Sequence, residues 1–300
     1  MKTYPHLFAK LFRSPLMLRN VEREIFEQQL LARIYGETSP AFAIEPPAPK
    51  AADTSKLPWR VANIFEQFGD VAVIHIDGVI DKRISAMDMS CYGGCDLADV
   101  DTALSICAAD PGIQRIVLDI HSPGGSVVGV HETWTRIKQM QETDKEVHAY
   151  VNALACSAGY YLASAADQIS AAPSAIVGSI GVYLAVLDAS KYMELEGLNL
   201  QMIKAGKWKD TGSQHRPLSE EETTKLQAEV DAMHAQFKTA VTQNRAIAPE
   251  SMEGQWMTAQ QGHEQGLVDE LTLATLDEFV SELLADSPSI RSMTSSSSRF

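Results

Sequence analysis

The chain has 300 residues, of which 45% are hydrophobic and 21% charged, a balance typical of a globular protein with a sizeable core. Its net charge of −14 repels phosphate backbones, so we expect no nucleic-acid partner. No segment approaches the roughly 20 apolar residues of a membrane span, and the first ten residues are too interrupted for a signal-peptide core. We therefore expect a cytoplasmic chain without a membrane span.

Composition changes along the chain predict four segments. Residues 1–37 carry apolar side chains near helical spacing, broken at Pro15, and predict a helical N-terminal arm that either docks elsewhere or packs on the domain. Residues 38–58 form a Pro/Ala-rich linker. The main domain is expected over 59–286, and residues 287–300, which are rich in serine, predict a disordered tail.

Within the main domain, strand-like and helix-like segments alternate, which predicts an α/β fold with a largely parallel sheet. A loop is expected over 81–95 and a turn over 122–126. Strands are expected at 71–78, 114–120, 147–151, 168–172 and 199–203, and helices at 96–109, 127–142, 188–196, 219–244, 258–264 and 275–284.

The four cysteines do not form a recognisable metal or redox motif. Cys91 and Cys95 are separated by three residues, which could supply half of a zinc site or a redox pair. No second cysteine or histidine pair follows at zinc spacing, however. We therefore expect reduced structural thiols, no metal and no cofactor.

The small-residue stretch around Ser157 is a candidate nucleophile site. An apolar strand-like segment precedes it, and a helix-like segment rich in Tyr, Leu and Ala follows it. A serine at such a helix N-terminus exposes its hydroxyl on a sharp turn, next to backbone N–H groups that can stabilise an oxyanion. The alternative is a tightly packed core helix of small residues.

A second glycine-containing turn, Ser122-Pro-Gly-Gly125, lies between a predicted strand and a predicted helix. Glycines there let backbone N–H groups approach a ligand without an intervening Cβ atom. Because ligands gather at the carboxyl ends of parallel strands, this turn is expected near Ser157. The alternative is a simple connection.

A nucleophilic serine needs a base, and the residues leave two classes open. His148 and His215 are the nearest histidines on either side of Ser157, but neither lies on a convincing loop soon after it. The polar segment 204–210 supplies three lysines, including Lys209 beside Trp208. A lysine acts as a base only when its pKa is lowered, so surface lysines remain the alternative.

Five motifs, taken together and in order over residues 70–285, resemble the signal peptide peptidase family of serine peptidases, which shares its fold with Clp protease and crotonase. The resemblance implies repeated β-β-α units with a largely parallel sheet. The motifs are Ser122-Pro-Gly-Gly125, Ala155-Cys-Ser-Ala-Gly-Tyr-Tyr161, Gly178-Ser-Ile-Gly-Val182, Lys204-Ala-Gly-Lys-Trp-Lys-Asp210 and Gly266-Leu-Val-Asp-Glu270.

The same resemblance implies roles for individual residues. Ser157 corresponds to the nucleophile, Lys209 to the general base and Ser179 to the serine that orients the lysine amine. The oxyanion hole is formed by Gly124, Gly125 and the N–H of Ala158. A histidine of the Clp type after the serine is missing, which favours a Ser–Lys dyad.

The basic helical region before the linker resembles the bacteriophage branch of this family, the head-maturation proteases. That branch implies a protein substrate such as a capsid scaffold or portal-associated protein, self-processing, and a location in the host cytoplasm with the procapsid. Relatives assemble as rings or domes, so a homo-oligomer is expected. The alternatives are a bacterial peptidase of the signal peptide peptidase type, a non-catalytic capsid-associated protein and, last, acyl-CoA chemistry of the crotonase kind.

Overall fold

The computed structural model describes residues 16–18 and 57–286. The predicted N-terminal arm and linker lie outside these residues except at 16–18 and at the linker's last two positions, and the predicted tail lies wholly outside them.

The described residues divide into two compact units. Residues 16 and 182–236 form the smaller unit, and residues 17–18, 57–181 and 237–286 form the larger one. The candidate nucleophile lies in the larger unit.

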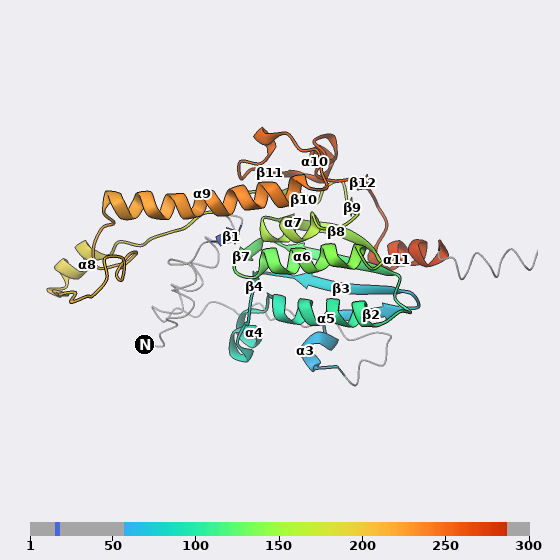
Figure 1. Ribbon diagram of the computed structural model, residues 1–300, viewed down its shortest axis with the longest axis horizontal. Coiled ribbons are helices and arrows are strands. Elements are labelled where there is room, and N and C mark those ends of the chain that lie inside the picture. The colour runs from blue at the N-terminus through green and yellow to red at the C-terminus, as the bar shows by residue number, and fades with distance from the viewer. Residues whose placement is uncertain (1–15, 19–56, 287–300) are drawn as a thin grey trace, which may run out of the picture. The chain divides into compact units, whose positions relative to one another are not determined.

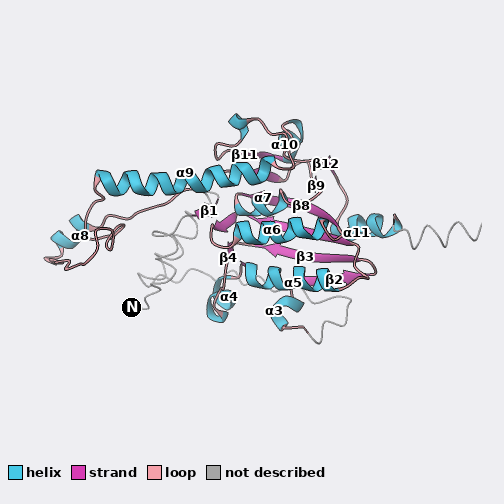
Figure 2. Cartoon of the chain, viewed as in Figure 1, coloured by secondary structure: helices cyan, strands magenta, loops and turns pink. Residues whose placement is uncertain are grey.

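The larger unit is built on an eight-stranded sheet (Figure 1, Figure 2). Six of its strands follow the order β11-β10-β8-β6-β3-β2, and β9 and β12 continue from β8. Only β2 and β11, at the ends of this order, run antiparallel to their neighbours; the other pairings are parallel. The strands are β2 (Phe65–Phe68), β3 (Val71–Asp77), β6 (Arg115–Ser122), β8 (Glu146–Cys156), β9 (Gln168–Ala171), β10 (Ile176–Gly178), β11 (Trp256–Thr258) and β12 (Glu270–Leu271).

The long strand β8 organises the sheet because three strands pair with it. β6 runs along one side for most of its length. On the other side, β9 pairs with residues 148–151 and β10 pairs with residues 154–156. The carboxyl end of β8 is therefore flanked by the ends of β6 and β10, which are also the places where the predicted site residues follow.

Helices cover both faces of the sheet. In β3, Val71 and Val73 contact Phe279 and Val280 of α11 in one buried cluster. The alternate residues of β3 point to the opposite face, in front of which α5, α6 and α7 lie (Figure 1). Ile74 on that face is fully buried, and such a side chain contributes roughly 1.5–3 kcal/mol. The helices are α5 (Leu97–Ala109), α6 (Val130–Gln141), α7 (Ala158–Ala163), α10 (Ala259–Glu264) and α11 (Leu276–Ala285).

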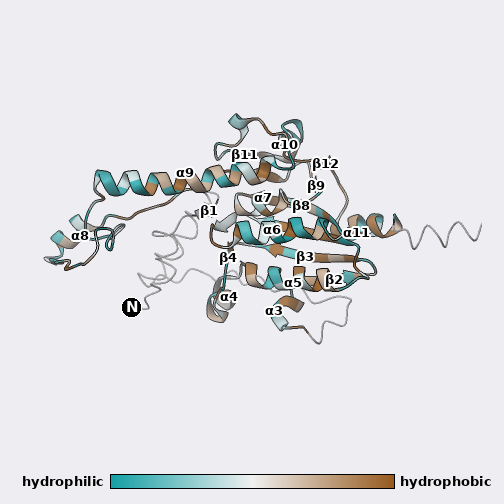
Figure 3. Cartoon of the chain, viewed as in Figure 1, coloured by the Kyte–Doolittle hydropathy of each residue, from teal (hydrophilic) through white to brown (hydrophobic). Residues whose placement is uncertain are grey.

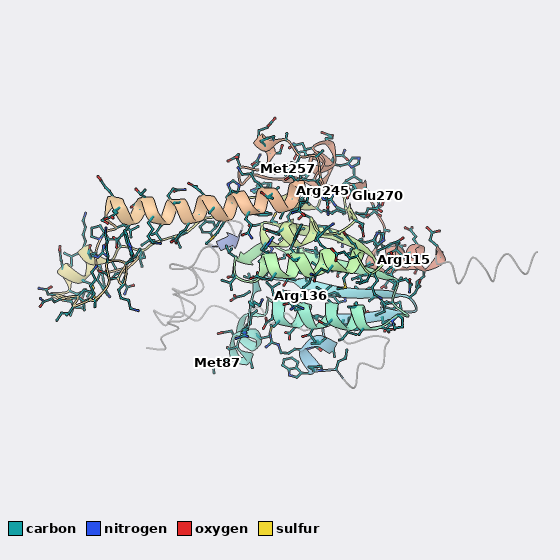
Figure 4. All side chains as sticks on the ribbon, in the orientation of Figure 1. Met87, Arg115, Arg136, Arg245, Met257 and Glu270 are labelled. Atoms are coloured by element: carbon teal, nitrogen blue, oxygen red, sulfur yellow. The ribbon has the colours of Figure 1, made fainter. Side chains whose placement is uncertain are left out.

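Helix α11 is fastened to the sheet by polar as well as apolar contacts. Apolar colouring is concentrated in β3 and α11 (Figure 3). The hydroxyl of Tyr150 donates to the carbonyl of Ala274 over 2.7 Å. Arg115, labelled beside α11 in Figure 4, donates to the carbonyl of Leu283. Both hydrogen bonds satisfy polar groups that are partly buried where α11 packs on the sheet.

A second, four-stranded sheet has the order β1-β7-β4-β5. β4 is parallel to both β5 and β7. Helix α4 lies between β4 and β5 in the chain, and the short helix α3 precedes β2. The elements are β1 (Leu16–Leu18), α3 (Trp59–Ala62), β4 (Ile80–Asp81), α4 (Ala86–Tyr92), β5 (Cys95–Asp96) and β7 (Gly124–Ser126).

The smaller unit holds α8 (Ser190–Leu195) and most of α9 (Glu220–Thr242). Helix α9 begins with a capping box: the Glu222 N–H donates to the Ser219 hydroxyl, and the Ser219 N–H donates to the Glu222 carboxylate. Within the described ranges, no helix combines the length and the apolarity that crossing a bilayer requires.

Most predicted elements of the described residues are confirmed, with four corrections. The predicted turn at 122–126 contains strand β7, and the predicted loop at 81–95 contains helix α4. The predicted strand at 199–203 is irregular. Residues 16–18, predicted within a helical arm, form strand β1. Strands β1 and β7 form because each pairs with a strand from a distant part of the chain, which outweighs the local pattern.

Candidate active site

Ser157 occupies a sharp turn between the end of β8 and the start of α7. Its backbone has φ 53° and ψ −117°, a conformation that costs a non-glycine residue roughly 1–3 kcal/mol. The residue is only 1% exposed, and its side chain caps no amide of α7. A strained serine at a strand-to-helix turn has the geometry of a nucleophile elbow.

Small residues after Ser157 let α7 approach β6 closely. A Cβ atom on Gly159 would lie 3.0 Å from the Ser122 carbonyl oxygen and 3.1 Å from the Ser122 Cβ. The first intrahelical bond of α7 runs from the Tyr161 N–H to the Ser157 carbonyl over 2.8 Å. The amides of residues 158–160, including Ala158, therefore have no acceptor within the helix.

Ser179 lies beside Ser157 on the neighbouring strand. Cys156 and Gly178 are paired in the parallel ladder of β8 and β10, whose strands are about 4.8 Å apart. The Ser157 N–H donates to the Gly178 carbonyl over 2.8 Å. Ser179 also has a positive φ of 53°, and its N–H donates to the Gln255 carbonyl over 2.7 Å. The two serines are thus fixed as neighbours by main-chain bonds.

The glycine turn lies on the other side of β8. Ser122 pairs with Ala155, two residues before Ser157. The Ser122 hydroxyl donates to the Gly78 carbonyl over 2.7 Å and accepts from the Gly124 N–H over 3.1 Å. An oxyanion that uses the Gly124 amide must therefore compete with this internal bond.

Each glycine of the turn is required for its own reason. Gly124 has φ +106°, which disfavours other residues. Gly125 packs directly on β4, because a Cβ atom there would lie only 1.9 Å from the Ile80 carbonyl oxygen. The turn is held in place by the second sheet rather than by its own sequence alone.

Lys209, the predicted base, belongs to the smaller unit, and its residue is exposed. Its N–H donates to the Gly206 carbonyl over 3.2 Å. The ring of Trp208 lies 4.7 Å from the ammonium of Lys207. Within this unit, the Trp208 ring thus contacts the neighbouring lysine, Lys207.

An ion-pair network fixes the chain immediately after Lys209. Arg216 donates to Asp210 over 3.0 Å and to both carboxylate oxygens of Glu222 over 2.6 and 2.7 Å. Hydrogen bonds from Arg216 and then Lys204 lower the pKa of Asp210 to about 2. Hydrogen bonds from Arg216 and the Ser219 amide likewise hold the pKa of Glu222 well below its usual range. Both carboxylates are therefore charged at neutral pH.

The two histidines considered as bases belong to different units. His148 is nine residues before Ser157 on β8, roughly 30 Å along an extended strand. Its ring contacts Phe279 of α11 at 6.3 Å between centroids, and burial lowers the pKa of His148. His215 belongs to the smaller unit, where its Nδ1 lies 2.8 Å from the Met193 sulfur.

A polar cluster that positions α7 was missed at the sequence level. His131 of α6 is hydrogen-bonded through Nδ1 to the Tyr161 hydroxyl over 2.9 Å. The indole N–H of Trp134 donates to the Ser164 hydroxyl over 3.1 Å. The Tyr161 ring stacks on Phe237 at 4.5 Å. The spacing of His131 and Trp134, three apart on one helix face, was the available signal.

The larger unit is thus a mixed α/β fold in which a strained serine, a second serine and a glycine turn meet at the end of β8. The larger unit therefore belongs to the mixed α/β class, with Ser157 at a strand-to-helix turn. Residues 139–286 match the model of Peptidase family S49.

Three similar proteins extend this match, two of them over nearly the whole chain. The chain is 28% identical over 290 residues to Capsid assembly protease C of Escherichia phage lambda, covering 92% of this chain and 64% of that protein. It is 28% identical over 284 residues to Head-tail preconnector protein GP5 of Enterobacteria phage P21, covering 90% and 55%. It is 33% identical over 161 residues to the chloroplastic Serine protease SPPA of Arabidopsis thaliana, covering 52% and 24%.

These findings confirm the predicted relationship to signal peptide peptidases and phage capsid proteases. The chain spans between 55% and 64% of the length of the first three relatives it matches.

Proposed function

We propose that this S49 peptidase is a serine endopeptidase that uses Ser157 as its nucleophile and Lys209 as its general base. The observation that carries the proposal is the strained turn at Ser157, flanked by Ser179 on one side and by the glycine turn on the other. The name of the SPPA relative, a serine protease, supports it. A Clp/crotonase-like arrangement of β-β-α units is part of the same proposal.

The proposed reaction has two steps. The neutral amine of Lys209 takes the proton of the Ser157 hydroxyl, and the oxygen attacks the substrate carbonyl. The N–H of Ala158, together with that of Gly124 or Gly125, stabilises the oxyanion, and Ser179 orients the lysine amine. The protonated lysine then gives its proton to the leaving amine, and water hydrolyses the acyl-enzyme with the lysine again acting as base.

The proposed assembly is a homo-oligomeric ring or dome. Because Lys209 belongs to the other compact unit, the dyad in this proposal combines Ser157 with a Lys209 of the same chain or of a neighbouring copy. The proposed substrate is a capsid scaffold or portal-associated protein, processed in the host cytoplasm at the procapsid, together with self-processing. The names of the two phage relatives support this substrate class.

The nucleophile is tested by replacing Ser157 with alanine. Cleavage of a casein-like or scaffold substrate is expected to fall roughly 10⁴–10⁶-fold, and labelling by a fluorophosphonate probe is expected to disappear. The matched control is Ser174→Ala, since Ser174 is exposed and lies in the turn before β10. Undiminished cleavage by purified Ser157→Ala would refute the proposal.

The base is tested by mixing two inactive variants, Ser157→Ala and Lys209→Ala. Activity regained in verified mixed oligomers assigns the dyad to neighbouring subunits, whereas no recovery assigns it to one chain. Lys207→Ala is the control, because Lys207 contacts Trp208 and Glu221 and has no proposed part in the chemistry. Full activity of Lys209→Ala would remove the lysine from the mechanism.

A further inference from the structure

Strand β1 reaches the glycine turn of the candidate site from far away in the sequence. In the smaller sheet, β7 lies between β4 and β1 and is hydrogen-bonded to both (Figure 1). β7 consists of Gly124–Ser126, and β1 consists of Leu16–Leu18, more than a hundred residues earlier. One edge of β7 is thus occupied by β4, and the other edge by β1.

The edge that β1 occupies belongs to the same end of the molecule as Ser157. Helix α7, which starts directly after Ser157, contacts β7. Ser122, two residues before Gly124, pairs with Ala155, two residues before Ser157. The chain therefore leaves the main sheet toward Ser157 and toward β7 at two paired positions, Ala155 and Ser122.

Extended peptides bind proteins by adding a strand to a free sheet edge, where main-chain hydrogen bonds supply the affinity. A peptide bond attacked by Ser157, with its oxyanion at the glycine turn, must run alongside β7. The β4 edge of that strand is closed by the pairing of Ile80 with Gly125. The remaining edge is the one that β1 fills.

We propose, resting on the proposed function, that Leu16–Leu18 is a built-in competitor for the peptide-binding edge of β7. The segment occupies the place that an extended peptide substrate takes. Substrate then binds only to molecules whose β7 edge is free. The apparent dissociation constant therefore equals the intrinsic one divided by the fraction of such molecules.

The test compares Met17→Pro with Met17→Ala in the full chain. Proline removes a backbone donor and resists incorporation into a ladder, whereas alanine retains the N–H. Met17→Pro is expected to lower the KM for an added apolar peptide by roughly tenfold relative to Met17→Ala, as expected if the edge is free in about a tenth of wild-type molecules. Equal KM values for the two variants would overturn the proposal.

A binding measurement separates this proposal from the catalytic one. A fluorescent peptide with the sequence of residues 14–20 is titrated into both Met17 variants carrying Ser157→Ala, so that no turnover is needed. Tighter binding to the proline variant supports competition by β1, and equal binding refutes it. Failure of the proposed function is seen independently, as cleavage that persists in Ser157→Ala.

Discussion

Gly125→Ala is expected to disrupt the contact between the two sheets. The added Cβ atom would lie 1.9 Å from the Ile80 carbonyl oxygen, 2.6 Å from its carbon and 2.7 Å from the Ile80 nitrogen. Non-bonded carbon and oxygen atoms need more than about 3 Å, so β4 and β7 must separate by roughly 1 Å. The separation breaks their pairing at Ile80 and Gly125.

The size of the effect follows from two contributions. Overpacking that moves the backbone costs typically about 1–3 kcal/mol, and a lost main-chain hydrogen bond adds about 1 kcal/mol. The free energy of unfolding should therefore fall by roughly 2–4 kcal/mol. For a unit of this size that lowers the Tm by roughly 5–15 °C.

Thermal unfolding followed by circular dichroism measures this shift. The control is Gly112→Ala, because Gly112 is exposed and the nearest atom to its added Cβ is the movable Asp110 carboxylate oxygen at 3.1 Å. A Gly125→Ala protein that melts within about 2 °C of the control would show that the two sheets accommodate the methyl group without loss of stability. That result would refute the prediction.

Three further predictions concern residues outside the catalytic set. Burial lowers the pKa of His75, but its hydrogen bond to Asp119 and the charge of that carboxylate outweigh burial and raise the pKa above 6.5. The stabilisation lost in His75→Gln is thus expected to be largest below pH 6.5 and to shrink as the pH rises through the raised value; a pH-independent difference in urea unfolding would contradict this. Burial raises the pKa of Cys107 to about 12, so this thiol should resist a maleimide at pH 8 until denaturant is added, and mass spectrometry of native labelled protein checks it. Arg216→Ala leaves Glu222 without its bidentate partner and should speed hydrogen exchange over 204–222 without affecting the larger unit. Unchanged exchange over 204–222 would show that the ion-pair network does not order this segment.

The sequence predicted the main sheet well because its elements carry strong local signals. Val71 to Ile76 is an almost continuous apolar run, and Asp96, the first residue of the predicted helix at 96–109, caps α5 through the Ala98 amide. The relation of Ser179 to Ser157 was implied by resemblance alone, since only the register of β8 and β10 makes them neighbours. Positive φ at both serines has no sequence signature, because it is imposed by the surrounding strands.

The smaller sheet could not be predicted from local pattern. β4, β5 and β7 are two or three residues long, and a two-residue strand has no periodicity to recognise. Leu16–Leu18 fits a helical pattern as well as a strand, and only its partner β7 decides between them. The relation of Lys209 to Ser157 stays a prediction from the family motif.

The backbone strain at Ser157 and Ser179 has an evolutionary consequence. Glycine adopts positive φ without the steric penalty of a side chain, so either serine could be replaced by glycine with a gain in stability. A lineage released from selection for catalysis would therefore be drawn toward glycine at these two positions. With serine at both positions, this chain has a less stable backbone than its fold allows.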